Sequence, residues 1–420
     1  MSVRRLPLAT AFRPVYVVWE LTLACDHACR HCGSRAGQAR ATELSTEQAL
    51  DVVAQLAAMG AGEVVLIGGE AYLHDGFLTI VRALRAAGIR ATMTTGGLGI
   101  TAERARAMAD AGIQLVSVSV DGLEESHDRI RSRTGSWASA MRALDHLREA
   151  GIPTASNINV NRINRGDLEA LYEVLRERGV RAWQVQITSP LGRAADRPEM
   201  LLQPWDLLEL VPRITALKRR AHAEGIRVLP GNNLGYFGPD EAALRSPTPD
   251  GEDHWQGCQA GRFVMGIESD GAVKGCPSLQ TASYVGGTLR SSSLKELWDT
   301  PEVGFTRTRT VNDLWGYCRS CDYAETCMGG CSFTAHAMFG RPGNNPFCVH
   351  RARVMRRRGQ RERLVPTTAA DGRPFDHGRF EIQLEEFGAE DEVAAPETLV
   401  RIGRKPRRPE RAWRDEGNTN

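Results

Sequence analysis

The 420-residue sequence lacks a continuous apolar run of the roughly 20 residues that a membrane-spanning helix requires. Its beginning, Met1 to Arg13, also lacks the apolar centre of a secretory signal. No charge of one sign dominates, because 53 Lys and Arg face 51 Asp and Glu and the net charge is +2. Such a chain has no global field that attracts nucleic acid or an anionic membrane. We therefore predict a soluble, cytoplasmic protein without a membrane or nucleic-acid partner.

Cysteine is absent from the long stretch between Cys32 and Cys258, although the chain has ten cysteines. Three of them lie between Cys25 and Cys32, and the remaining seven lie between Cys258 and Cys348. A cytoplasmic chain of this size does not need disulfides, and its thiols are kept reduced. Reduced thiols that cluster in this way indicate metal binding.

The region from about Val15 to Val228 repeats one pattern, an apolar strand followed by an amphipathic helix that ends at glycine. A glycine after a helix adopts the left-handed conformation that ends it, and these stops are Gly60, Gly88, Gly112, Gly151, Gly179 and Gly225. We predict strands at Val15–Thr22, Glu63–Ile67, Arg90–Thr95, Gln114–Val120, Thr154–Val160 and Ala182–Thr188. Their Val and Ile content predicts an α/β fold with a parallel sheet. Six such units fit a partial, TIM-like (β/α)6 barrel better than the eight-unit form.

The composition divides the chain into four parts. We predict the barrel over residues 14–228 and a linker rich in Gly, Pro and Asn over 229–257. Residues 258–353 are predicted to form a small, cysteine-rich domain organised by metal, with one helix at Ser293–Asp299. Residues 354–420 form a charged tail that we expect to be mostly solvated or disordered. Docking of this tail near a substrate is the alternative.

The first cysteine group has the spacing Cys25-x3-Cys29-x2-Cys32 and follows the first predicted strand directly. Three thiolates so close in sequence can hold three irons of a [4Fe–4S] cluster and leave the fourth iron open to another ligand. A zinc knuckle with His27 or His31 as the fourth ligand is the alternative, since structural zinc prefers a closed tetrahedral site. The Cys-x3-Cys spacing, which is unusual for zinc, favours the cluster.

This CxxxCxxC motif in the first strand–helix loop resembles the signature of the radical S-adenosylmethionine (SAM) superfamily. The resemblance extends over the barrel region, from about Val15 to Thr188. It implies that Cys25, Cys29 and Cys32 hold a [4Fe–4S] cluster that cleaves SAM reductively to a 5′-deoxyadenosyl radical. That radical abstracts a hydrogen atom from an unactivated carbon of the substrate.

Further motifs of the superfamily occur in the same order. By this resemblance, Gly68, Gly69 and Glu70 bind the methionine amino group of SAM, although a Gly-Gly pair alone is only a turn signal. The resemblance also places His31 near the adenine, Ser119 on the strand that contacts the ribose, and Arg131 at the SAM carboxylate. Ala71 replaces the proline that many relatives have after this glutamate.

The second cysteine group resembles the SPASM domain, a C-terminal extension of radical SAM enzymes that binds auxiliary [4Fe–4S] clusters. The family pattern assigns four cysteines to the distal cluster, Cys318, Cys321, Cys327 and Cys348. It assigns three to the nearer cluster, Cys258, Cys276 and Cys331, so the chain would hold three [4Fe–4S] clusters in all. Where some relatives carry another cysteine this sequence has Glu252, Asp253 and His254, which leaves the fourth ligand open. A pair of zinc ribbons is the alternative.

SPASM proteins act mostly on peptides and proteins, so the resemblance implies a maturase of a ribosomally made peptide. Arg193, in the turn Pro190-Leu191-Gly192-Arg193-Ala194, resembles a turn that flanks the substrate opening in peptide-modifying relatives. The expected partners are a precursor peptide, an electron donor such as flavodoxin or ferredoxin, and a separate leader-peptide-binding protein or the C-terminal tail.

The cysteine count favours one reaction type. Radical epimerases need a spare thiol to return a hydrogen atom, and the assignment above uses all ten cysteines. Oxidative cross-linking instead needs an acceptor for a second electron, which auxiliary clusters provide. We therefore predict thioether or carbon–carbon cross-linking. The alternatives are peptide epimerisation, Ser or Cys oxidation of the sulfatase-maturing type, and a zinc-bound scaffold that is not an enzyme.

Overall fold

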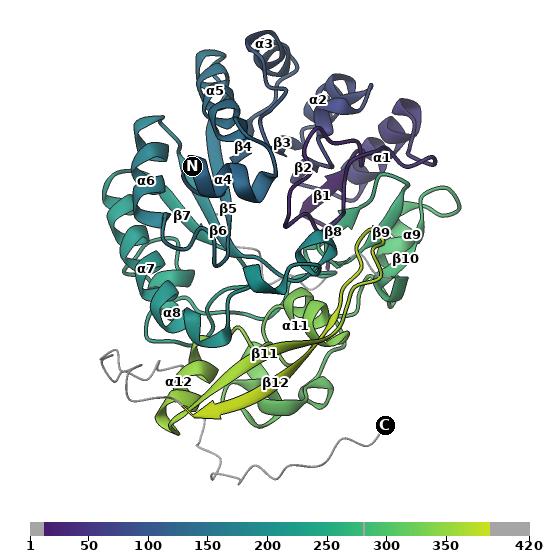
Figure 1. The fold of residues 1–420 in the computed structure, drawn as a ribbon. Helices are drawn as coiled ribbons and strands as arrows, with labels where there is room; N and C mark the ends of the chain where they lie inside the picture. The colour runs from purple at the N-terminus through teal and green to yellow at the C-terminus, as the bar shows by residue number, and fades with distance from the viewer. Residues whose placement is uncertain (1–11, 280–281, 387–420) are drawn as a thin grey trace.

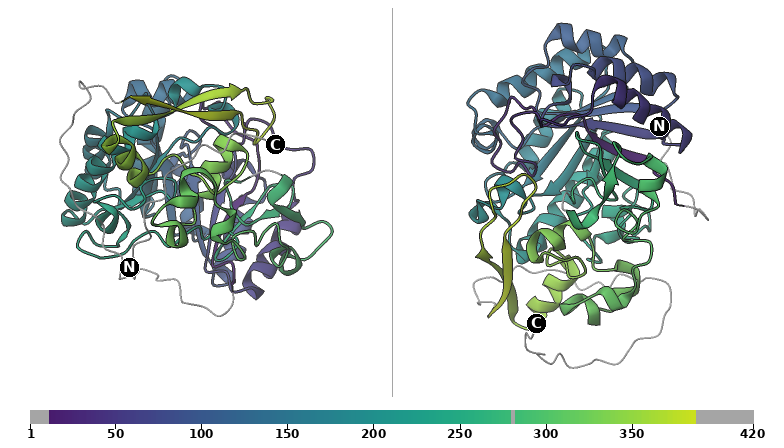
Figure 2. Two further views of the ribbon diagram at one scale, coloured as in Figure 1. Left: turned by 90° about the horizontal axis from the view of Figure 1, so that it is seen from below. Right: turned by 90° about the vertical axis from the view of Figure 1, so that its right-hand side faces the viewer.

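The structure is a computed structural model that describes residues 12–279 and 282–386 (Figures 1 and 2). Its main sheet has ten strands in the order β10-β9-β8-β1-β2-β3-β4-β5-β6-β7. The strands of this sheet are β1 (Tyr16–Glu20), β2 (Glu63–Ile67), β3 (Arg90–Thr95), β4 (Leu115–Ser119), β5 (Thr154–Val160), β6 (Ala182–Ile187), β7 (Arg227–Pro230), β8 (Val264–Ile267), β9 (Ala272–Lys274) and β10 (Val285–Thr288). No helix among the described residues is long and apolar enough to cross a membrane.

Strands β1 to β7 pair in parallel, each with the next along the chain, and the sheet stays open between β7 and β10. The helices of this part lie around the outside of the curved sheet (Figure 1). They are α1 (Thr46–Ala58), α2 (Phe77–Ala86), α3 (Ala102–Asp110), α4 (Glu124–Arg131), α5 (Ser136–Glu149), α6 (Leu168–Glu177) and α7 (Leu207–Ala223). The predicted partial barrel is confirmed, and the six expected strands agree with β1 to β6 to within two residues at either end.

Local sequence signals explain where these helices begin and end. Ser45 caps α1 by accepting a hydrogen bond from the Gln48 backbone, and the Gln48 side chain bonds back to the Ser45 backbone. All six glycines predicted as helix stops have positive φ, between 73° and 88°. The helices therefore end where the chain must turn directly into the next strand.

The cysteine-rich part extends the same sheet. Strand β8 pairs in parallel with β1, and β9 and β10 follow as antiparallel strands. The helices here are α9 (Leu294–Trp298), α10 (Ala324–Cys327), α11 (Ser332–Phe339) and α12 (Val349–Arg357). The expected helix at Ser293–Asp299 corresponds to α9 with its two capping residues. The region expected to be a linker is partly regular, because it holds the end of β7 and helix α8 (Glu241–Arg245).

The beginning of the charged tail forms a hairpin, which the sequence did not predict. Strands β11 (Gln360–Thr368) and β12 (Arg379–Glu386) pair antiparallel as a separate two-stranded sheet. Leu364 and Phe380 are buried in the main hydrophobic core of the protein. Packing of these apolar side chains stabilises the hairpin despite its charge. The rest of the tail, 387–420, lies outside the described residues.

Candidate active site

The first three cysteines lie in a loop at the C-terminal end of β1, and we call residues 24–37 the cysteine loop. Its two ends are joined, because the Cys25 N–H donates to the Gly37 carbonyl (3.1 Å) and the Gly37 N–H donates to the Leu23 carbonyl (2.9 Å). The loop is thereby closed at its base. In a barrel of parallel strands, binding sites form at the C-terminal ends of the strands, where this loop lies.

The spacing of the thiols argues against one zinc ion in this loop. In a tetrahedral zinc site with bonds of 2.3 Å, the sulfur atoms lie about 3.8 Å apart. Among the described residues, only Cys25, Asp26 and His27 bring three potential ligand atoms within 4.8 Å of one another. Asp26 and His27 are bonded to each other at 2.8 Å. The more widely spaced thiols of Cys25, Cys29 and Cys32 suit a larger iron–sulfur cluster.

The Gly68-Gly69 pair packs directly against the cysteine loop. The Gly69 N–H donates to the Thr22 carbonyl (2.7 Å) and the Glu70 N–H to the Ala24 carbonyl (2.8 Å). A Cβ on Gly69 would lie 2.6 Å from the Cβ of Cys25, and a Cβ on Gly68 would collide with the Thr22 carbonyl. The glycines therefore permit close contact between the end of β2 and the loop. Their contact with SAM stays a prediction.

The Glu70 side chain joins the ends of β2 and β3. Its carboxylate accepts a hydrogen bond from the Thr95 hydroxyl (2.6 Å) and one from the Gly96 N–H (2.6 Å). Burial raises the pKa of Glu70 to about 7. The side chain thus has structural partners in this protein, in addition to its predicted role toward SAM.

Asp121, at the end of β4, brings together two predicted SAM-binding residues. Its buried carboxylate lies 2.8 Å from Arg131 Nη2 and 3.0 Å from His31 Nε2. Burial opposes ionisation, but the charges of Arg131 and then His31 hold the pKa of Asp121 well below its ordinary value. Arg131 Nη1 also donates to the Cys29 sulfur at 3.6 Å. In the sequence, Asp121 belongs to the motif Ser119-Val120-Asp121-Gly122, which resembles the ribose-contacting strand, but its pairing with His31 and Arg131 has no sequence signal.

Several polar groups around the cysteine loop are ready to bind a ligand. Ser119 lies inside the barrel, where its hydroxyl bonds to the Asn157 side chain at 3.1–3.2 Å. Within the described part of the chain, His27 Nε2, His31 Nδ1 and Arg131 Nε are buried without a hydrogen-bond partner. Buried polar atoms in proteins are almost always paired. This set therefore fits a polar cofactor such as SAM next to a cluster on the loop.

Arg193 binds the backbone of the cysteine loop. It lies in the short turn Gly192–Ala194 after β6, and its backbone N–H donates to the Cys32 carbonyl (3.0 Å). Its guanidinium donates to the Cys29 carbonyl (2.8 Å) and the Ala36 carbonyl (3.1 Å). The resemblance to peptide-modifying relatives places Arg193 beside the substrate opening. In the structure it organises the backbone of the loop that carries the cysteines.

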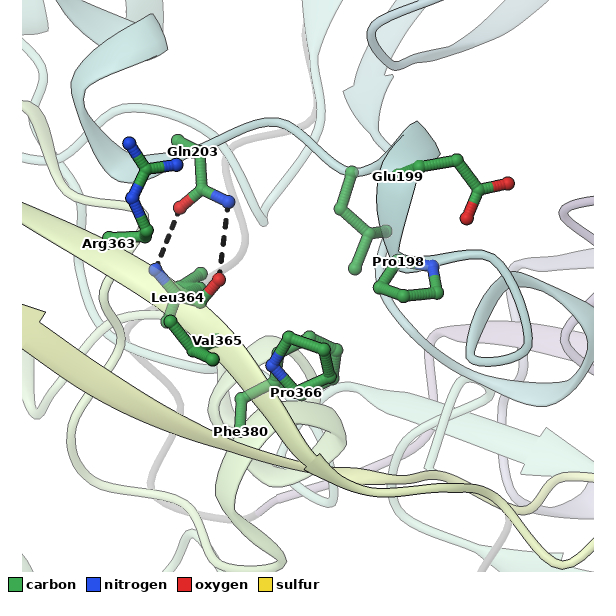
Figure 3. A pocket seen from close by; sticks show the side chains of 9 residues that line it. Pro198, Glu199, Gln203, Arg363, Leu364, Val365, Pro366 and Phe380 are labelled. Atoms are coloured by element: carbon green, nitrogen blue, oxygen red, sulfur yellow. Dashed lines mark hydrogen bonds between the residues drawn. The ribbon is translucent and has the colours of Figure 1, made fainter.

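A pocket opens between the segment after this turn and the C-terminal hairpin (Figure 3). The Gln203 side chain crosses the seam, since it accepts the Leu364 N–H (2.7 Å) and donates to the Leu364 carbonyl (3.3 Å). The other wall residues labelled in Figure 3 are Pro198, Glu199, Arg363, Val365, Pro366 and Phe380. The hairpin is therefore fixed to the barrel through its first strand.

Four cysteines of the second domain line one cavity, namely Cys318, Cys321, Cys327 and Cys348. Aromatic rings of Phe237, Tyr317, Tyr323 and His350 complete the wall. Burial raises the pKa of all four thiols, and their mutual proximity raises several of them further. Four thiols around one buried cavity fit a [4Fe–4S] cluster with a complete cysteine set.

The other three cysteines form a separate group. Burial raises the pKa of Cys276 to about 12 and that of Cys331 to about 11, and the neighbouring Cys258 thiol contributes to both increases. Beside this group, Arg309 Nη1 donates to the Ser332 hydroxyl (2.8 Å), whereas the buried Arg309 Nη2 has no partner among the described residues. Cys258, Cys276 and Cys331 therefore lie near one another, and their role as cluster ligands stays a prediction.

Two of the residues found where some relatives carry another cysteine, Asp253 and His254, contact Ser246 and Phe237. The Asp253 N–H donates to the Ser246 hydroxyl (2.8 Å). The His254 ring lies 6.1 Å from the ring of Phe237, which belongs to the wall of the four-cysteine cavity.

Comparisons with known proteins agree with this arrangement. The family model for the radical SAM superfamily matches residues 19–175, and the model for the SPASM iron–sulfur cluster-binding domain matches residues 258–322. The chain is 32% identical to mycofactocin maturase MftC of Mycolicibacterium smegmatis over 346 residues, 80% of this chain and 83% of that protein. It is 27% identical to AdoMet-dependent heme synthase of Nitratidesulfovibrio vulgaris over 362 residues, 81% of this chain and 93% of that protein.

A solved structure supports the fold. Streptococcus suis SuiB bound to the precursor peptide SuiA superposes with a TM-score of 0.61 at 16% identity, over 79% of this chain and 75% of that chain. The barrel and the thiol groups are those of an iron–sulfur enzyme that uses SAM. The chain belongs to the radical SAM superfamily, in the subgroup that carries a SPASM domain.

Proposed function

We propose that this radical SAM enzyme introduces an oxidative cross-link, a thioether or a carbon–carbon bond, into a ribosomally made peptide. The observation that carries the proposal is the distribution of the cysteines. Each of the ten lies in the cysteine loop, in the four-cysteine cavity or in the three-cysteine group. No cysteine is left outside these groups to return a hydrogen atom, as epimerisation requires.

The relatives support a peptide as the substrate. One is named as the maturase of mycofactocin, and a structural neighbour was solved with a precursor peptide bound. An oxidised product loses two hydrogens, one as an atom and one as a proton with an electron. Once bound, SAM and a cluster on the cysteine loop would supply the radical that takes the hydrogen atom. Auxiliary clusters on the other cysteines would supply an electron acceptor.

The protein's own residues position and shield this chemistry. Cys25, Cys29 and Cys32 would hold the SAM-binding cluster, and Arg131 lies between the Cys29 sulfur and Asp121. His31 and Arg131 face the SAM site with unpaired buried nitrogens. Ser119 offers a hydroxyl from the adjacent strand end. Because Asp121 fixes His31 and Arg131 and Asn157 fixes Ser119, little reorganisation is needed when SAM binds.

Co-expression with a short peptide encoded next to the gene, followed by mass spectrometry, tests the proposal. We expect a product lighter by two hydrogen atoms, with fragmentation blocked between the joined residues. The control is Cys29→Ser, which should leave the peptide unchanged. A product of unchanged mass that contains a D-amino acid would establish epimerisation and overturn cross-linking, and loss of two hydrogens from one Ser or Cys would establish the sulfatase-maturing type of reaction.

A tetrapyrrole substrate is the second candidate, because the chain aligns with 93% of a protein named AdoMet-dependent heme synthase. Incubation of the reduced enzyme with SAM and iron porphyrins, followed by absorbance and mass spectrometry, separates the two proposals. Formation of heme without any change in peptides would replace the first candidate by the second.

Several further features belong to the same proposal. We expect three [4Fe–4S] clusters, hence about twelve irons per chain after anaerobic preparation. A colourless protein without iron would instead support a zinc scaffold. We also propose a cytoplasmic location, reduction by a flavodoxin or ferredoxin, and delivery of the peptide by a separate leader-binding protein.

A further inference from the structure

The loop of the C-terminal hairpin, residues 369–378, reaches the cysteine loop from the other end of the chain. Two residues are enough to connect antiparallel strands, so this connection is much longer than the hairpin needs. Phe375 lies in it, 6% exposed, and packs with Leu23 and Ala36 in a small apolar cluster. Cys25 and Cys32 pack against the same cluster. The Phe375 side chain therefore covers the part of the cysteine loop that holds two of the three ligands.

Positive charges also contact the Phe375 ring. The Arg40 guanidinium lies 5.3 Å from the ring centroid, and the Lys274 ammonium lies 5.5 Å from it. Both cations pair with Glu268, at 2.9 Å each. Phe375 is thus held between the cysteine loop and strand β9 of the SPASM domain.

Polar contacts join the same two loops. Arg35 Nε donates to Asp376 Oδ1 (2.9 Å) and to the Arg373 carbonyl (2.9 Å). The other end of the Arg35 guanidinium forms two hydrogen bonds with Asp196, at 2.6 and 2.7 Å. The Gly192 N–H donates to the Asp376 carbonyl (2.8 Å). The Arg35 side chain is therefore fixed from two directions, by Asp196 after β6 and by the loop of the hairpin.

The backbone on both sides of this contact is in an unfavourable conformation. Arg35 has a φ of 50° and Phe375 a φ of 61°, a region that residues other than glycine rarely adopt. Such conformations persist only where the surrounding contacts enforce them, and they concentrate at functional sites. Their occurrence in two loops that touch each other, more than 330 residues apart in sequence, indicates that the contact is built into the site.

We propose that Phe375 and Asp376 are positioning residues of the SAM-cleaving site. Phe375 covers the loop around Cys25 and Cys32, and Asp376 fixes Arg35, so that a cluster on this loop is retained and stays shielded from solvent. The C-terminal hairpin is then a part of the active site of the barrel. The inference does not depend on which substrate the enzyme modifies.

Iron release from the anaerobic holoenzyme tests this proposal. A ferrous chelator is added, and cysteines that lose their iron are alkylated and mapped by mass spectrometry over time. In Phe375→Ala and Asp376→Asn we expect alkylation of Cys25 and Cys32 to accelerate about five- to thirtyfold, the effect of a modest loss of local stability. Alkylation of Cys318 and Cys348 should keep its wild-type rate, because these residues lie in the separate four-cysteine cavity.

A spectroscopic measurement and matched variants separate positioning from folding. The electron paramagnetic resonance signal that changes on addition of SAM reports the cluster of the cysteine loop, and it should lose intensity in both variants. Phe375→Leu, which keeps an apolar cover, should restore most of the signal. The controls are Asp371→Asn in the same loop, with a side chain 65% exposed, and Leu384→Ala on β12, with a residue 49% exposed.

Two results would overturn the proposal. In one, Cys25 and Cys32 react at the wild-type rate in both variants and the SAM-dependent signal is unchanged. In the other, alkylation accelerates equally at Cys318 and Cys348, which would mean that the substitutions loosen the whole protein.

Discussion

The cysteine loop and the four-cysteine cavity both present thiols as metal ligands, but the residues around these thiols differ. The cavity is lined by aromatic rings, among them Tyr323 from the same domain and Phe237 from the segment before it, whose rings stack 4.3 Å apart. The cysteine loop is held by charged side chains from distant segments, such as Arg131 and Arg193. The thiols of the four-cysteine cavity are therefore surrounded by aromatic rings, whereas those of the cysteine loop lie in a loop that several distant segments hold in place.

This difference corresponds to two uses of an iron–sulfur site. An enclosed set of four thiols leaves no open ligand position and suits electron transfer. A set of three thiols beside unpaired polar atoms leaves one position for SAM. The scaffold must then fix the loop without covering the open position, and Arg193 does so through the loop backbone.

Replacing one buried cysteine in each region is the strongest way to test the comparison. Cys29 and Cys327 are matched, at 7% and 8% exposure. We expect Cys29→Ser to lower SAM cleavage more than about 100-fold, since even indirect partners of a metal site are worth 10–100-fold. Cys327→Ser should retain SAM cleavage while product formation fails. Chromatography of 5′-deoxyadenosine measures the first effect, and SAM cleavage at the wild-type rate in Cys29→Ser would contradict the assignment.

Each region also contains one buried arginine–carboxylate pair, and these pairs give the next largest effect. Arg131 pairs with Asp121 at 2.8 Å, and Arg351 pairs with Glu362 at 2.6 Å. Removing one partner leaves a buried charge unpaired and costs about 3–5 kcal/mol. Arg131→Met and Arg351→Met should therefore both lower the free energy of unfolding by that amount.

Only one of the two variants should affect the affinity for SAM. Arg131→Met removes a predicted SAM contact, whereas Arg351 lies beside the four-cysteine cavity. In Arg131→Met, the additional change Asp121→Asn should recover part of the lost stability, because the Asp121 carboxylate is then no longer buried without its arginine partner. Equal SAM affinities in the two arginine variants would remove the functional distinction between the regions.

The comparison also explains which features the sequence predicts. The barrel strands and the helix stops follow from local patterns, as the positive φ of glycines such as Gly60 and Gly225 confirms. The grouping of the cysteines follows from their spacing in the sequence. The supports of the cysteine loop do not, because Arg35 and Asp376 are 341 positions apart and neither has a local signal.

The hairpin was the largest element that the sequence analysis did not predict. The signal for β12 is the alternation of Phe380, Ile382 and Leu384 with polar residues. The acidic charge of the same stretch hides this pattern. The contact of Gln203 with Leu364 that anchors β11 depends on tertiary packing, which no short window of sequence reveals.

The buried carboxyl group of Glu20, at the end of β1, predicts a pH effect on the stability of the protein. Burial raises the pKa of Glu20 from 4.5 to about 7, although Arg40, at 3.2 Å, opposes this increase. The folded state then binds a proton that the unfolded state releases. The resulting stabilisation is fully present below about pH 4.5 and is lost as the pH rises through 7.

Glu20→Gln should remove this dependence. Between pH 4.5 and 8, wild type is expected to lose roughly 3 kcal/mol of stability that the variant keeps. The measurement is the free energy of unfolding of both proteins across this range, with the exposed Glu47→Gln as the control. Parallel pH profiles for wild type and Glu20→Gln would show that Glu20 ionises normally in the folded protein.

The smallest expected effect concerns the aromatic wall of the four-cysteine cavity. The rings of Phe237 and Tyr323 are nearly parallel, with an interplanar angle of 7°. Aromatic pairs contribute about 0.5–1.5 kcal/mol beyond the area they bury. A double-mutant cycle with Phe237→Leu and Tyr323→Leu should therefore give a coupling energy in this range. SAM cleavage should stay at the wild-type level in all three variants, because the rings surround the enclosed thiols and not the cysteine loop. Reduced SAM cleavage in these variants would mean that the two regions are coupled, and that the enclosed site contributes to the chemistry at the open one.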